Sequence, residues 1–128
     1  MEHIQLSANE WKLMERLWRK EPQTITQLTA EIQPIYGWTK HTVITMLNRL
    51  ENKGAVAYQE GERARLYSTC IPRSQAAMEE TETLLERVYG GSLGLMVNAF
   101  VQQKGITEEE RDSLLALLNE TPVRKKEE

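Results

Sequence analysis

The sequence predicts a mainly α-helical fold, in which a helix-turn-helix with a small β-hairpin is followed by a C-terminal region of three helices. One observation is a capped amphipathic helix that begins at Thr39 and stops at Gly54. Another is a pair of short β-type segments directly after it, joined by a turn that contains Gly61. The third is the leucine-rich helical periodicity from Arg73 onwards. The order of helices and hairpin is that of a winged helix, a variant of the helix-turn-helix.

The first two helices are predicted from their start and stop signals. Ser7-Ala8-Asn9-Glu10 has the S-x-x-E pattern of a capping box, and Glu21-Pro22 stops the helix that it opens. We expect a short strand at Thr24-Ile25 and a second helix capped by Thr26. The predicted end signals of that helix are Pro34 and Gly37.

The third helix is predicted to have one apolar and one polar face. At about 100° per residue, the apolar positions Val43, Met46, Leu47 and Leu50 share one side. His41, Thr45, Asn48 and Asn52 lie opposite, flanked by Ile44 and Arg49. A helix with this division suits the DNA major groove, which admits an α-helix with small polar and basic groups.

A hairpin is predicted after this helix. Its strands are 55–59 and 66–69, joined by the turn Glu60-Gly61-Glu62-Arg63. Arg63 and Arg65 are two residues apart, so strand alternation would place them on one face. The hairpin would then carry basic side chains beside the third helix.

The three C-terminal helices are predicted to form a dimer. They are amphipathic and leucine-rich, and they cannot bury their apolar surface alone, so a second copy of the chain is expected to cover it. We therefore expect three regions, a DNA-binding domain at 1–72, a helical dimerisation domain at 73–120 and a flexible tail at 121–128. The expected dimerisation residues are Leu93, Met96, Val97, Phe100, Leu114, Leu115 and Leu118.

Composition and charge limit the classes of protein to which this chain can belong. The formal net charge of the 128 residues is −3, but residues 38–70 hold five basic side chains against three acidic ones. No apolar run approaches ~18 residues, so no membrane insertion is expected. The single Cys70 cannot form an internal disulfide. With no secretory signal at the start, these features predict a cytoplasmic protein.

No catalytic or cofactor chemistry is expected. The sequence contains no nucleophile–base pair, no glycine-rich phosphate loop and no metal-ligand spacing, and His41 has no second His or Cys near it in sequence. The sequence therefore predicts a protein that is not an enzyme and that needs no metal or cofactor.

Several segments resemble the penicillinase repressor and methicillin-resistance regulator family (BlaI/MecI type). They are 7–11, 38–43, 47–54 and 67–68, and the segments 88–91 and 97–101 resemble the dimerisation region of that family. The resemblance covers roughly residues 4–120. It implies a homodimeric bacterial repressor with an N-terminal winged helix, bound to a double-stranded palindromic operator.

The resemblance also implies a mode of induction. In the antibiotic-responsive branch, a membrane sensor triggers proteolytic cleavage within the dimerisation helices, usually at an Asn-Phe bond. The candidate cleavage site in this chain is Asn98-Ala99, with Phe100 one residue later. This difference leaves induction by cleavage open, and the absence of a C-terminal cysteine cluster argues against the copper-responsive branch.

The DNA interpretation assigns a role to each exposed residue of the third helix and the hairpin. Thr39, Lys40 and Thr42 would hold a phosphate at the helix N-terminus, and the side chains that follow would read the bases. Two alternatives stay open: a winged helix that binds a protein partner, and a regulator that binds an effector without proteolytic induction. The expected DNA-binding residues are Thr39, Lys40, His41, Thr42, Ile44, Thr45, Asn48, Arg49, Arg63 and Arg65.

Overall fold

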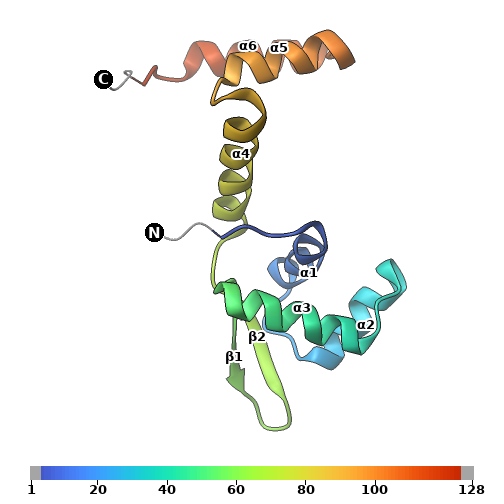
Figure 1. Cartoon of the computed structure of the whole chain (residues 1–128). Helices are drawn as coiled ribbons and strands as arrows, with labels where there is room; N and C mark the ends of the chain where they lie inside the picture. Colours follow the sequence, from blue (N-terminus) through green and yellow to red (C-terminus); the bar gives the residue numbers. More distant parts are fainter. Residues whose placement is uncertain (1–3, 125–128) are drawn as a thin grey trace. The chain divides into compact units, whose positions relative to one another are not determined.

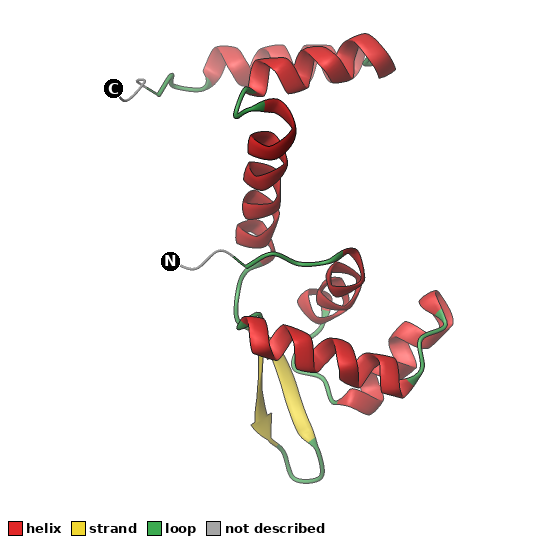
Figure 2. Ribbon diagram, viewed as in Figure 1, coloured by secondary structure: helices red, strands yellow, loops and turns green. Residues whose placement is uncertain are grey.

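The computed structural model describes residues 4–124 of the chain. Six helices and one two-stranded antiparallel sheet follow one another in it (Figures 1 and 2). The predicted mainly α fold with a β-hairpin wing is confirmed. The elements are α1 (Ala8–Arg19), α2 (Ile25–Tyr36), α3 (Lys40–Lys53), β1 (Val56–Glu60), β2 (Arg65–Thr69), α4 (Arg73–Tyr89), α5 (Leu93–Lys104) and α6 (Glu108–Glu120).

The chain forms two compact units, Met1–Leu84 and Leu85–Glu128. The division falls inside α4, later in the chain than the expected boundary between 72 and 73. The expected tail at 121–128 lies partly outside the described residues, which end at 124.

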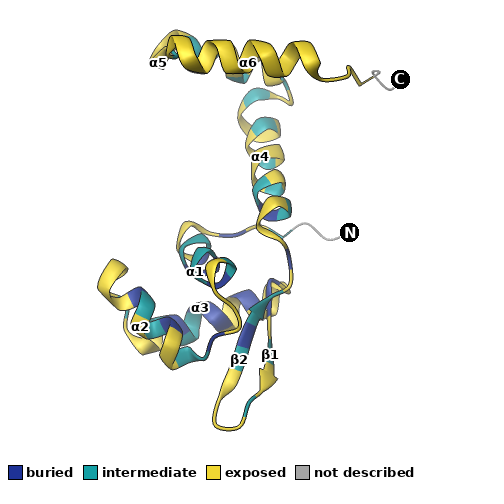
Figure 3. Cartoon of the chain, turned by 180° about the vertical axis from the view of Figure 1, so that it is seen from behind, coloured by how far each residue is buried: buried dark blue, intermediate teal, exposed yellow. Residues whose placement is uncertain are grey.

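The core of the first unit is formed by the inward faces of its helices and by the base of the hairpin (Figure 3). The four apolar residues predicted on one face of α3 are all buried, as the helical spacing required. Burying one such side chain stabilises the fold by about 1.5–3 kcal/mol. The polar face of α3 is thereby turned outward. The other helical core residues are Leu13, Met14, Leu17, Leu28, Ile32 and Ala76.

The start of α2 differs from the prediction. Thr24 is the N-cap: its hydroxyl accepts a hydrogen bond from the Gln27 N–H at 3.1 Å, and the Gln27 side chain accepts one from the Thr24 N–H at 2.9 Å. The predicted cap at Thr26 and the predicted strand at Thr24-Ile25 are therefore wrong. The extended residue is Gln23, which pairs with Tyr67 of β2 as an isolated bridge. A T-x-x-Q capping box was the signal in the sequence.

The end of α2 also differs in one respect. Pro34 lies inside the helix and does not end it, whereas Gly37 forms the left-handed C-cap with φ 72°. A proline removes the hydrogen bond to the carbonyl four residues earlier, here that of Ala30. Ala30 is exposed, so water can satisfy this carbonyl, and the helix continues to Tyr36.

These two assignments give a paired prediction for the cap of α2. Thr24→Ala is expected to lower the free energy of unfolding by about 1 kcal/mol, because it removes a capping hydroxyl. Thr26→Ala is the matched control, since Thr26 is exposed in the first turn and is not the cap. Urea unfolding followed by circular dichroism measures both. A larger loss for Thr26→Ala would contradict the assignment.

The hairpin pairs Val56 with Thr69 at its base and Glu60 with Arg65 at its outer end. Gly61 begins the connecting turn and donates a backbone hydrogen bond to the Ala64 carbonyl at 2.9 Å. A Cβ atom at residue 61 would lie 2.5 Å from this oxygen, so the turn requires glycine there. Arg63 lies in this turn and outside β2. Strand alternation, on which the prediction of a shared face with Arg65 depended, therefore does not apply to Arg63.

The second unit contains α5 and α6, and neither helix has a buried residue (Figure 3). Thr107 caps α6 through a capping box with Glu110. These bonds hold the pKa of Glu110 below its ordinary value, first through the Thr107 backbone N–H. Within residues 4–124, no helix is long and apolar enough to cross a membrane.

Candidate nucleic-acid interface

The polar face of α3 forms a continuous exposed surface. His41, Asn48 and Arg49 are exposed, while Ile44 and Thr45 are half-buried along the same face. At the N-terminal end, Thr39 caps the helix by accepting a hydrogen bond from the Thr42 N–H at 3.2 Å. The structure thus brings the predicted residues of α3, including the exposed Lys40, together on one helix.

Local hydrogen bonds limit what two of these hydroxyl groups can do. The Thr45 hydroxyl donates to the His41 carbonyl at 3.0 Å, so toward a ligand it offers only acceptor positions and its methyl group. The hydroxyl groups of Thr39 and Thr42 lie 3.2 Å apart and share one hydrogen bond. Asn48 has no such internal partner within residues 4–124, so its amide can both donate and accept.

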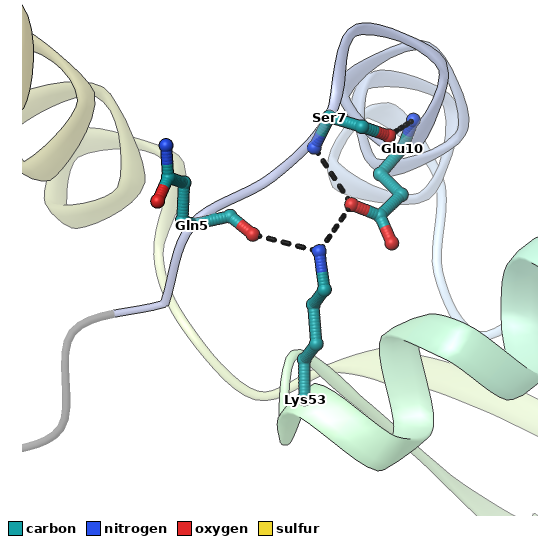
Figure 4. A network of polar contacts seen from close by, with 4 residues as sticks. All are labelled: Gln5, Ser7, Glu10 and Lys53. Atoms are coloured by element: carbon teal, nitrogen blue, oxygen red, sulfur yellow. Dashed lines mark hydrogen bonds and ion pairs between the residues drawn. The ribbon is translucent and has the colours of Figure 1, made fainter.

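A polar network fixes the C-terminal end of α3 against the start of α1 (Figure 4). The Lys53 Nζ atom lies 2.6 Å from the Glu10 Oε1 atom and donates to the Gln5 carbonyl at 2.8 Å. Glu10 also accepts from the Ser7 N–H at 2.7 Å, as the predicted capping box requires. Lys53 is the residue before the Gly54 cap of α3, whose φ is 81°.

Glu10 is almost fully buried, with 1 % of its surface exposed. Burial alone would raise the pKa of its carboxyl group, but the hydrogen bonds from Lys53 and Ser7 and the charge of Lys53 outweigh it. The pKa of Glu10 is therefore below its ordinary value, and the carboxylate is ionised at neutral pH. The network holds α3 in place on α1.

Aromatic side chains support the turn that leads into α3. The rings of Tyr36 and Trp38 lie 5.6 Å apart on either side of Gly37. The ammonium group of Lys12, from α1, lies 5.0 Å from the Tyr36 ring centroid. Trp38 also packs on the core. The N-terminal end of α3 is thus braced by these contacts.

In the wing formed by β1 and β2, Arg65 contacts neighbouring side chains, whereas Arg63 makes no such contact within residues 4–124. The Arg65 guanidinium lies 4.1 Å from the Tyr58 ring centroid, and its Nε atom lies 3.5 Å from a Glu60 carboxylate oxygen. The pKa of Arg65 is raised, first by a side-chain hydrogen bond with Tyr67 and then by Tyr58. Arg63 is exposed and makes no hydrogen bond, ion pair or ring contact within the described part of the chain.

The residues expected to form a dimer lie on α5 and α6. The exposed fractions of Leu93, Phe100 and Leu118 are 59 %, 60 % and 67 %. Val97, Leu114 and Leu115 are also exposed, and Met96 is half-buried. At the candidate cleavage site in α5, Asn98 and Phe100 are exposed and Ala99 is half-buried.

No group of three or more His, Cys, Asp or Glu side chains that could hold a metal ion occurs among residues 4–124. The surface offers hydrogen-bond donors, acceptors and cations on a helix and an adjacent hairpin.

The fold and this surface define a DNA-binding winged-helix repressor. Residues 6–120 match the penicillinase repressor family, and the chain belongs to that family. The family is one of transcriptional repressors, so the chain is not an enzyme.

Relatives support this assignment along nearly the whole chain. The penicillinase repressor of Bacillus licheniformis is 30% identical over 123 residues, which cover 96% of each chain. The methicillin resistance regulatory protein MecI of Staphylococcus aureus is 24% identical over 115 residues, which cover 90% of this chain and 94% of that protein.

Solved structures match the first part of the chain. The DNA-binding domain of the repressor BlaI has a TM-score of 0.53 and 27% identity, covering 58% of this chain and 90% of that one. The monomeric form of Bacillus licheniformis BlaI in complex with the blaP half-operator has a TM-score of 0.52, with the same identity and coverage.

The sequence analysis missed the residues that support this surface from behind. Neither the pair of Glu10 and Lys53 nor the contact of Tyr58 with Arg65 was predicted. The second had a usable signal, because Tyr58 is diagonal to Arg65 in the hairpin register. The first joins positions 43 residues apart, and no local pattern indicates such a contact.

Proposed function

We propose that this chain is a homodimeric transcriptional repressor that binds a palindromic operator, with α3 in the major groove and the wing beside it. The observation that carries the proposal is the exposed polar face of α3, which is held in place by a buried apolar face and by caps at both ends. The resemblance to BlaI bound to the blaP half-operator supports it. We also propose the domain limits 1–72, 73–120 and 121–128 given above.

The N-terminal end of α3 is suited to hold a DNA phosphate. The first backbone N–H groups of a helix point outward and carry a partial positive charge. Lys40 adds a full charge, and the hydroxyl groups of Thr39 and Thr42 add polar contacts. Such contacts fix the register of a protein on the duplex without reading its sequence.

The middle of α3 is suited to read base edges. Asn48 can pair with adenine through two hydrogen bonds, and Ile44 or the Thr45 methyl group can contact the methyl group of thymine. His41 offers a further polar contact, and Arg49 flanks the surface as a cation. On the wing next to α3, both Arg63 and Arg65 are exposed.

A second copy of the chain is the proposed cover for α5 and α6. In an isolated chain these helices would leave a series of large apolar side chains in water. A dimer would make the second half-site contact intramolecular, which raises overall affinity by roughly 10² to 10⁴. A repressor of this kind would act in the cytoplasm, where the DNA is.

Derepression would follow from loss of this dimer. Cutting or loosening α5 and α6 removes the gain in affinity without altering α3. Cleavage at 98–100 by a protease pathway that a membrane sensor controls is one such route. The exposed side chains of Asn98 and Phe100 are consistent with it.

Asn48→Ala is expected to relax base preference at one position in each half-site. Losing a bidentate contact with a base costs about 1–3 kcal/mol of discrimination. Asn52→Ala is the matched control, since Asn52 is exposed one turn further from the N-terminal end. Competition between operator duplexes that differ at single positions measures the effect. Unchanged preference for Asn48→Ala would remove Asn48 from the recognition surface.

Selection of bound sequences from a pool of random duplexes tests the proposed function itself. The purified full chain is expected to enrich a palindrome with two half-sites about one or two helical turns apart. A pool that stays random after repeated selection would contradict operator recognition.

A further inference from the structure

We propose that the two wing arginines have different roles: Arg63 contacts DNA phosphate, whereas Arg65 is a positioning residue that keeps the wing in shape. This inference rests on the proposed function, and it assigns the wing contact to a single residue.

Arg65 is held by aromatic side chains of the wing. Its guanidinium lies over the Tyr58 ring at 4.1 Å, and the Tyr58 ring lies 5.6 Å from the ring of Tyr67. Tyr67 is buried, with 2 % of its surface exposed. A stack therefore runs from the core to the outer part of the wing and ends on Arg65.

The charge of Arg65 is balanced by a carboxylate on the opposite strand. Glu60 is paired with Arg65 in the strand register, and its carboxylate lies 3.5 Å from the Arg65 Nε atom. The pair has no net formal charge. Salt dependence of DNA binding comes from cations that replace counterions on phosphates. A neutralised ion pair therefore contributes little to the salt dependence of DNA binding.

Arg63 has a different position in the wing from Arg65. It lies in the exposed turn beyond the last strand pair, where neither ring nor carboxylate engages it within residues 4–124. The turn is held by the Gly61 hydrogen bond to Ala64. A long cationic side chain on a short braced turn can reach a phosphate without giving up an internal contact.

The experiment compares Arg63→Ala and Arg65→Ala on an operator duplex at several salt concentrations. Arg63→Ala is expected to reduce the slope of log affinity against log salt by about 1.8, because each of the two chains on the operator loses one phosphate contact worth about 0.9. Between 50 and 200 mM salt this is a difference of about twelvefold. Arg65→Ala is expected to leave the slope unchanged and to raise Kd by about two- to fivefold for each chain, the range for an exposed cation–π contact.

Tyr58→Leu tests whether Arg65 acts through the ring. It is expected to raise Kd as Arg65→Ala does, and the double variant is expected to be no weaker than either single one. Arg87→Ala, which removes an exposed arginine of α4, is the control for loss of general charge. Circular dichroism melting establishes that every variant folds.

The outcomes separate this inference from the proposed function. If the unaltered protein binds no duplex, the proposed function fails and the assignment of Arg63 fails with it. If it binds and Arg65→Ala flattens the slope as much as Arg63→Ala, only the division of roles is overturned. Additive losses for Tyr58→Leu and Arg65→Ala would also overturn it.

Discussion

Leu118→Arg is expected to weaken binding to a palindromic operator by about 10² to 10⁴, while the N-terminal unit stays folded. Leu118 lies near the middle of the apolar arc that the leucines 114, 115, 117 and 118 form on α6, at about 100° per residue. Its side chain is 67 % exposed in the single chain. A guanidinium placed there would have to lose its water in the proposed dimer, at a cost that prevents association.

Ala116→Arg is the matched control for this variant. It introduces the same side chain into the same helix, on the side opposite the leucine arc. Light scattering is expected to report a monomer for Leu118→Arg and a dimer for Ala116→Arg, and fluorescence anisotropy with a palindromic duplex measures Kd. Dimer mass for Leu118→Arg would contradict the placement of the dimer surface on α6.

Lys53→Met is expected to lower the free energy of unfolding at pH 7 by about 2–3 kcal/mol. The substitution keeps the length of the side chain and removes the ammonium group that neutralises the buried Glu10 carboxylate. Leaving one partner of a hydrogen-bonded charge pair without the other costs more than the pair itself contributes. Urea unfolding of Lys53→Met and the unaltered protein measures the loss.

The pH dependence of this loss follows from the pKa of Glu10. A carboxyl group whose folded pKa lies below its ordinary value of about 4.5 contributes stability above that value. This stability is lost as pH falls through the folded pKa. The difference in the free energy of unfolding between the unaltered protein and Lys53→Met is therefore expected to shrink as falling pH protonates the Glu10 carboxyl group in both.

Lys40→Met is the control, because Lys40 belongs to the same helix and has no ion-pair partner within residues 4–124. It is expected to change stability by less than about 0.5 kcal/mol. A gap for Lys53→Met that stays constant from pH 7 to pH 3 would exclude the Glu10 carboxylate as its cause.

Sequence reasoning succeeded where a signal is local and periodic. The buried face of α3 and the caps at Ser7, Thr39 and Gly54 each depend on residues within one or two turns. Their side chains and backbone conformations were therefore predictable from spacing alone.

It failed where two local readings competed. Thr24 and Thr26 are both plausible caps, and reading 24–25 as β-type selected the wrong one, although Gln27 completes a capping box with Thr24. Proline usually breaks a helix, but Pro34 is tolerated in the last turn of α2. The carbonyl that it leaves without a hydrogen bond belongs to Ala30, which is exposed. Strand alternation does not extend to Arg63, which lies in the turn before β2 begins.

The supporting contacts depend on more than the local spacing of residues. The bond between Lys53 and Glu10 exists only because α1 and α3 pack in one particular way. The contact of Arg65 with Tyr58 depends on the strand register, which shifts if a turn is one residue longer. Such contacts follow from the assembled fold.

A mobility-shift titration of the full chain tests the central claim most directly. It uses the duplex upstream of the gene for this protein, with random duplex as competitor, at two salt concentrations. A dimeric operator-binding repressor is expected to form a salt-sensitive complex that resists the competitor and contains two chains per duplex. Equal competition by random duplex at moderate salt would contradict operator recognition at this site.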